Sequence, residues 1–93
     1  MLVGRCQVEI LVLESHSLKD RRRVLDSLIE QLGNRYRVAA AQLDRSESWN
    51  RAVLGIAAVG NEKRHLQSVL QKVVNALEND TRITVLGVEM EID

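Results

Sequence analysis

The sequence predicts an α+β fold in which two helices cover one face of a four-stranded antiparallel sheet. Its 93 residues contain four strand-patterned and two helix-patterned segments, in the order β-α-β-β-α-β. Each helical segment has one apolar stripe and needs one sheet face, and two crossovers of the favoured hand put both helices on the same side. The result is a single domain over residues 1–93, the ferredoxin-like sandwich with strand order 4-1-3-2. An arrangement with strands exchanged between two subunits is the alternative.

The first half of the chain is expected to form a strand, a helix and a second strand. Residues 3–14 alternate in polarity, and Ser17 is a favoured N-cap for the helix that follows. Gly33-Asn34 is a typical helix stop signal, so residues 35–43 become the second strand. The strand residues expected beneath the helices are Cys6, Val8, Ile10 and Val12. The helical stripe contains Leu18, Leu25, Leu28, Ile29 and Leu32.

The second half repeats the pattern. A polar hairpin loop at residues 44–48 leads into a third strand, 49–60. Asn61 is the expected N-cap of the second helix, which ends at Asn79-Asp80, and the last strand is residues 82–92. The second helical stripe contains Leu66, Val69, Leu70, Val73 and Leu77. Alternation along the last strand places four residues on the helix-covered face: Leu86, Val88, Met90 and Ile92.

The same alternation predicts an apolar cluster at one end of the open sheet face. Its expected members are Leu11, Leu13, Trp49, Val53, Ile83 and Val85. A solvated antiparallel sheet face is normally polar, and an exposed apolar patch usually marks a partner. We therefore expect a homodimer that uses this face or a strand edge, since closed twofold pairs are the commonest oligomers. A loop or terminus folded over the cluster is the alternative.

Basic residues are concentrated at the start of the first helix. The run contains Lys19, Arg21, Arg22 and Arg23, and the topology brings Arg51 and Trp49 to the same end. Cations there oppose the helix dipole, and guanidinium groups beside free backbone N–H groups suit a phosphate or carboxylate. One competing interpretation is a solvated basic face, with Asp20 and Asp26 as local partners at helical spacing and Arg21 lying along the sheet edge. Another is that Trp49 anchors an interface rather than stacking on a base.

Composition argues against several classes of function. The formal net charge is zero, although residues 19–51 have eight basic and five acidic side chains, a local excess of +3. The single cysteine, Cys6, suits a cytoplasmic protein, and no apolar run is long enough to cross a membrane. His16 and His65 fall at opposite ends of the expected fold and build no metal site. We expect no catalytic residues, no metal and no cofactor.

Three segments resemble the YlxP-like family of small uncharacterised bacterial proteins. They are Ser17-Leu18-Lys19-Asp20-Arg21-Arg22, Trp49-Asn50-Arg51-Ala52-Val53-Leu54-Gly55 and Val88-Glu89-Met90-Glu91-Ile92. The resemblance covers nearly the whole chain and implies a ferredoxin-like fold. It supplies no catalytic residues, because the family has no established activity. The genes of similar proteins often lie near those for translation initiation and ribosome maturation, which implies an RNA- or ribosome-linked role. The loop Arg45-Ser46-Glu47-Ser48 departs from the shorter or more acidic stretch expected there.

These observations predict a small, non-catalytic interaction protein whose partner is RNA or a ribosome-associated assembly. Lys19, Arg21, Arg22, Arg23 and Arg51 are the candidate contacts. The alternative is a regulatory module that holds a small molecule at a dimer interface, an inference from the fold alone.

Overall fold

The computed structural model describes residues 1–43 and 48–93. The predicted hairpin loop at residues 44–48 therefore lies outside the described residues, apart from Ser48. The described elements, in chain order, are β1 (Leu2–Val12), α1 (Leu18–Tyr36), β2 (Ala39–Gln42), β3 (Arg51–Gly60), α2 (Lys63–Glu78) and β4 (Ile83–Ile92).

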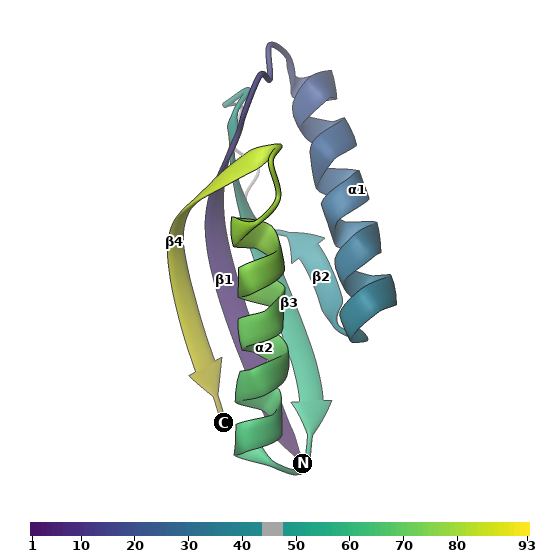
Figure 1. Ribbon diagram of the computed structural model, residues 1–93, viewed down its shortest axis with the longest axis vertical. Helices are drawn as coiled ribbons and strands as arrows, with labels where there is room; N and C mark the ends of the chain where they lie inside the picture. The colour runs from purple at the N-terminus through teal and green to yellow at the C-terminus, as the bar shows by residue number, and fades with distance from the viewer. Residues whose placement is uncertain (44–47) are drawn as a thin grey trace.

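The sheet has the predicted topology. Its strands lie in the order β2-β3-β1-β4, and each pair of neighbours is antiparallel. Both helices cover the same face, with α1 on the β2 side (Figure 1). Both termini lie at one end of the molecule, and the connection from β1 to α1 lies at the other end (Figure 1). The ferredoxin-like α+β fold is thus confirmed.

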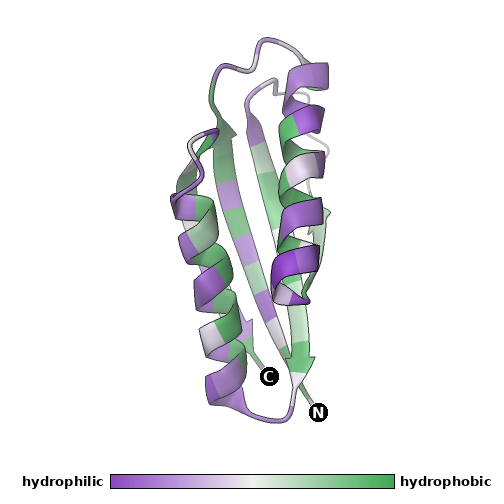
Figure 2. Cartoon of the chain, turned by 45° about the vertical axis from the view of Figure 1, so that its right-hand side comes forward, coloured by the Kyte–Doolittle hydropathy of each residue, from purple (hydrophilic) through white to green (hydrophobic). Residues whose placement is uncertain are grey.

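The core lies between the sheet and the two helices. The predicted inward residues of β1 are all buried: Cys6, Val8, Ile10 and Val12. Hydrophilic residues cover much of the outer surface of both helices (Figure 2). Leu18 is an exception to the predicted stripe of α1, because it is exposed in the first turn and the first buried apolar residue of the helix is Leu25. Burial also raises the pKa of the Cys6 thiol, which favours the unreactive protonated form.

The helix boundaries agree with the prediction at two ends and differ at the other two. The Asp20 N–H donates to Ser17 Oγ over 3.1 Å, so Ser17 caps α1 as expected, and α2 ends at Asn79. The predicted stop at Gly33-Asn34 is wrong. The helix continues to Tyr36, which packs against the core, and Arg37 takes the left-handed cap conformation with φ 55°. A left-handed residue other than glycine costs about 1 kcal/mol.

The remaining differences are the start of the second strand and the N-cap of α2. Because α1 runs longer than expected, the second strand is shortened to β2, at the edge of the sheet. The N-cap of α2 is Glu62 rather than Asn61, and the Glu62 side chain makes no capping hydrogen bond. The extended conformation of Glu62 alone marks the turn into the helix.

A β-bulge in β4 overturns part of the predicted register. Glu9 pairs with Gly87 but Ile10 pairs with Val85, so Leu86 is the extra residue on β4. The inserted residue reverses which side chains face the helices in the part of β4 that precedes it. Ile83 and Val85 consequently face the helices instead of the open face, and Ile83 is only 5% exposed. Leu86, predicted to be inward, is 43% exposed.

After the bulge, the residues of β4 lie on the predicted side of the sheet, but their side chains are only partly buried. Val88 pairs with Val8, and Met90 pairs with Cys6, so both share the helix-covered side with buried partners. They remain 41% and 37% exposed because β4 is an edge strand.

Candidate nucleic-acid interface

The basic run lies where β1 leads into α1, and hydrogen bonds join this loop to the start of β3. The Val12 N–H donates to the Asn50 carbonyl over 2.6 Å. The Ser15 hydroxyl donates to the Trp49 carbonyl and to the Ser17 carbonyl. These bonds bring the first turn of α1 and the Trp49 segment to one end of the molecule, as the topology predicts.

Arg21 has a structural role that separates it from the other bases in the run. It is the one charged residue among the buried positions of the described chain, at 8% exposure. Its Nη1 donates to the Ser48 carbonyl over 2.8 Å and to the Arg51 carbonyl over 2.9 Å. Arg21 therefore attaches α1 to the start of β3. Its Nε is buried without a hydrogen-bond partner in the described residues.

The exposed cations of the run are Lys19, Arg22 and Arg23. Their side chains make no ion pair with a carboxylate among residues 1–43 and 48–93. Arg23 also lines a hollow of about 480 Å³ together with Arg82 and Thr81. Arg51 is exposed too, but its Nη1 lies 3.5 Å from Glu9 Oε1, and this carboxylate offsets its charge. Three of the five predicted anion contacts are thus exposed and unpaired in the described structure.

Arg82 is a basic residue of this end that the sequence pattern does not single out. Its Nε and Nη2 donate to the two carboxylate oxygens of Asp80 over 3.0 and 2.8 Å, and its Nη1 donates to Ser27 Oγ. This bidentate pair lowers the pKa of Asp80. The only signal in the sequence is the short spacing Asp80-Thr81-Arg82, which is common in turns and says nothing about the contact with α1.

On the open face, the structure brings three of the six predicted interface residues to the same end. Leu11 pairs with Arg51, and Val53 pairs with Glu9, so Leu11 and Val53 are diagonal neighbours, both half-buried. Trp49 precedes β3 and is 60% exposed.

The other three predicted interface residues lie elsewhere. Leu13 lies beyond the end of β1 and lines the Arg23 hollow, while Ile83 and Val85 belong to the helix-covered face because of the bulge.

Leu43 is an open-face residue that the prediction missed. Its N–H donates to the Val53 carbonyl, its side chain is 51% exposed, and it lies over Gly55. A Cβ at Gly55 would lie 2.8 Å from three Leu43 side-chain atoms, so the glycine makes room for the leucine. Leu43 also borders a shallow, mainly apolar hollow of about 330 Å³ that contains Ala41 and Ala57. Alternation through residues 39, 41 and 43 would have located it.

The described residues also bear on the predictions about metal and membrane. Within residues 1–43 and 48–93, no three side chains of the types His, Cys, Asp and Glu gather as metal ligands do. In the same residues, neither helix has the length and hydropathy that a membrane crossing requires.

Comparisons with known proteins agree with the fold and identify a family. Residues 3–90 match the model of a family described as "Protein of unknown function (DUF503)". The chain is 26% identical over 78 residues to "Uncharacterized protein YlxP" of Bacillus subtilis (strain 168), covering 84% of this chain and 85% of that protein. The structured domain of Drosophila melanogaster Boca has a similar fold, with a TM-score of 0.53 and 13% identity over 94% of this chain and 95% of that one.

Proposed function

Because this chain belongs to the DUF503 family, whose description assigns no activity, its role has to be inferred from its own surface, and we propose that it is a non-catalytic RNA-binding protein of the cytoplasm. The family resemblance to proteins encoded near translation genes makes ribosomal RNA, or an assembly that contains it, the expected partner. The buried, protonated Cys6 thiol agrees with a reducing compartment.

The observation that carries the proposal is the set of exposed cations at the start of α1. Lys19, Arg22 and Arg23 keep their charges free of carboxylate partners in the described residues, at the helix end where positive charge is least favourable. Asp20 and Asp26 stand at helical spacing from these cations, but neither forms an ion pair with them within the described residues. A polyanion such as an RNA backbone would offset both the dipole and the mutual repulsion.

Trp49 gives this surface a second means of contacting RNA. The Ser15 hydroxyl holds the Trp49 backbone beside the start of α1, while the indole remains mostly exposed. An exposed aromatic ring beside guanidinium groups suits stacking with an unpaired base. Phosphate contacts from α1 and stacking on Trp49 would together favour a single-stranded segment over a duplex.

The experiment is a salt-dependent titration of a single-stranded ribosomal RNA fragment, followed by fluorescence anisotropy. Affinity should fall steeply with salt, and an R22Q/R23Q variant should reduce the slope of log K against log salt by about 1.4. K63Q/R64Q is the matched control, because it removes two exposed cations at the opposite end of the molecule. An affinity that does not change with salt concentration would contradict the proposal, and so would equal losses of affinity in the two variants.

We further propose that two copies pair through the open face. The side chains of Leu11, Leu43, Trp49 and Val53 leave an apolar end on this face, and the opposite end carries Arg5, Glu89 and Glu91. A second copy would cover the apolar end with an equivalent surface, as isologous pairing requires.

A further inference from the structure

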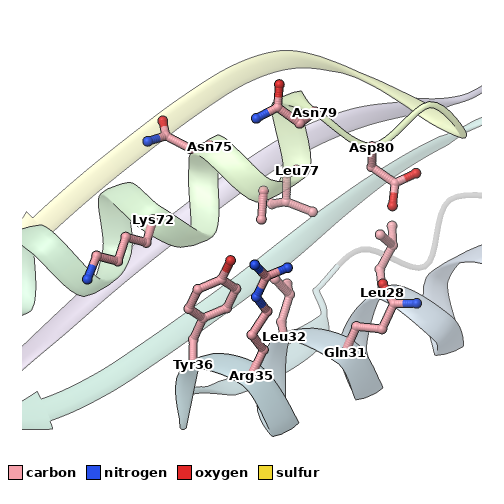
Figure 3. A pocket seen from close by; sticks show the side chains of 11 residues that line it. Leu28, Gln31, Leu32, Arg35, Tyr36, Lys72, Asn75, Leu77, Asn79 and Asp80 are labelled. Atoms are coloured by element: carbon pink, nitrogen blue, oxygen red, sulfur yellow. The ribbon is translucent and has the colours of Figure 1, made fainter.

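The two helices are separated by a polar cleft at mid-height. It is a hollow of about 550 Å³, a volume typical of sites for small molecules. Leu28, Leu32 and Leu77 contribute apolar side chains to it. In Figure 3, Arg35 and Tyr36 extend from α1 toward α2, and Lys72 and Asn75 lie on α2. The cleft thus combines an apolar floor with polar groups from two separate elements.

The cations of this cleft are not matched by free acids. The Arg35 guanidinium lies 5.4 Å from the centre of the Tyr36 ring, which orients it. Neither Arg35 nor Lys72 forms an ion pair within the described residues. Asp80 is the acidic residue that lines the hollow, and Arg82 already pairs with both of its oxygens. The net charge available to a ligand is therefore positive.

Asn75 adds a hydrogen-bond donor at the rim of the cleft. Its carbonyl oxygen accepts from the Gln71 amide over 3.0 Å, which leaves its NH₂ group as the end free to donate. Donors beside two cations match an anion with several oxygens better than they match an apolar ligand, a metal ion or a cationic peptide.

The positive surface continues into an adjoining hollow. This second space, of about 470 Å³, shares Arg35, Tyr36 and Lys72 with the first and adds Arg37 and His65. Arg37 occupies the left-handed cap position where glycine or asparagine is usual. Because the two hollows share these three lining residues, together they have room for a ligand longer than a single inorganic anion.

We propose that the cleft between α1 and α2 binds a ligand with a terminal phosphate monoester, with Arg35 and Lys72 contacting the phosphate and Asn75 donating a hydrogen bond. Two sources carry this group, a free nucleotide and the 5′-phosphorylated end of an RNA. The site is distinct from the cations at the start of α1 and does not depend on RNA binding there.

The test is a titration of the isotope-labelled protein by heteronuclear NMR at low salt. The probes are adenosine monophosphate, adenosine, and one RNA tetranucleotide with either a 5′-phosphate or a 5′-hydroxyl. Saturable shifts at Gln31, Arg35, Lys72 and Asn75 are expected with a phosphorylated probe only. A response to the mononucleotide identifies a free nucleotide as a sufficient ligand, and a response confined to the phosphorylated RNA identifies the RNA end.

Two variants of equal charge locate the site. R35Q/K72Q should weaken binding of the phosphorylated probe at least about tenfold, while K63Q/R64Q should change it by less than about twofold. All four residues are exposed, so the spectra of both variants should remain those of the folded protein. Absence of saturable shifts, equal responses to phosphorylated and unphosphorylated probes, or an unaffected R35Q/K72Q variant would overturn the cleft proposal. An equal loss in K63Q/R64Q would also overturn it, yet leave the proposed RNA-binding surface at the start of α1 intact.

Discussion

Arg21 shows how a single residue inside a basic run can belong to the fold rather than to the surface. Its neighbours Arg22 and Arg23 are exposed, whereas its own guanidinium is enclosed between α1 and β3. Helical spacing alone places Arg21 near the apolar stripe, but only the carbonyl groups of Ser48 and Arg51 explain why a charge can be buried there. A buried cation with accepting carbonyls is costly to remove, because those carbonyls then lose their donor.

Replacing Arg21 with alanine should lower the free energy of unfolding by about 2–3 kcal/mol, the range for hydrogen bonds from a charged donor. Replacing the exposed Arg22 with alanine should change it by less than about 0.5 kcal/mol. Urea denaturation of both variants measures the difference. Similar values for the two would mean that Arg21 does not hold α1 to β3.

Asp80 is a second residue whose role depends on one partner. The hydrogen bond from Arg82 is the main reason that its pKa lies below 3.8, and the folded state therefore favours the carboxylate. This contribution is fully present above the pKa of the unfolded chain, near 3.9, and is lost as the pH falls through the lower folded value.

Asp80→Asn should destabilise the protein at neutral pH by about 1–3 kcal/mol, because the charge-assisted bonds to Arg82 are weakened. The difference from the parent should shrink as the pH falls below about 4, where the parent loses the same carboxylate. Denaturation across this pH range is the measurement. If the difference in unfolding free energy between parent and variant stays constant down to strongly acidic pH, ionisation of Asp80 does not contribute to stability.

At the scale of elements, β4 shows where sequence patterns are least informative. Apolar residues occupy odd positions at Ile83 and Val85 and even positions from Leu86 to Ile92, so the alternation breaks at this point, but the order alone does not show which residue is the extra one. The bulge is set by pairing with β1, which lets Ile83 and Val85 enter the core at one end while Val88 stays on the same side lower down. The end of α1 has a similar cause, since packing of Tyr36 outweighs the local stop signal at Gly33.

The bulge predicts a contrast within one strand. Ile83→Ala should cost about 2–4 kcal/mol, as for a buried isoleucine, whereas Leu86→Ala should cost less than about 1 kcal/mol. Strict alternation without the bulge predicts the reverse order. Thermal or urea unfolding of the two variants under identical conditions decides between the two registers.

For the whole molecule, a formal net charge of zero conceals two separate positive regions. One is the exposed start of α1, and the other is the cleft between the helices, where Arg82 neutralises Asp80. The open face differs from both, because its apolar end is exposed and has no covering segment among the described residues. The start of α1 and the cleft thus place exposed cations on the helical layer, whereas the exposed apolar end lies on the open face of the sheet.

Sedimentation should give the mass of two chains at micromolar concentration. A Trp49→Glu, Leu43→Glu variant should give the mass of one chain, since both changed side chains are exposed and lie at the apolar end. Val59→Glu is the control: Val59 is equally exposed but lies at the other end of β3, and the dimer should survive its replacement. A parent protein that sediments as one chain would refute the pairing.

The sequence alone predicts the order of elements, the layer arrangement, the inward face of β1 and the Ser17 cap, because these follow from periodicity and local hydrogen bonding. It also located the exposed bases at the start of α1. The position of the bulge at Leu86, the buried role of Arg21 and the cleft lined by Arg35 and Lys72 are visible only in the folded chain. Each of these depends on contacts between residues far apart in the chain, and no local pattern records such contacts.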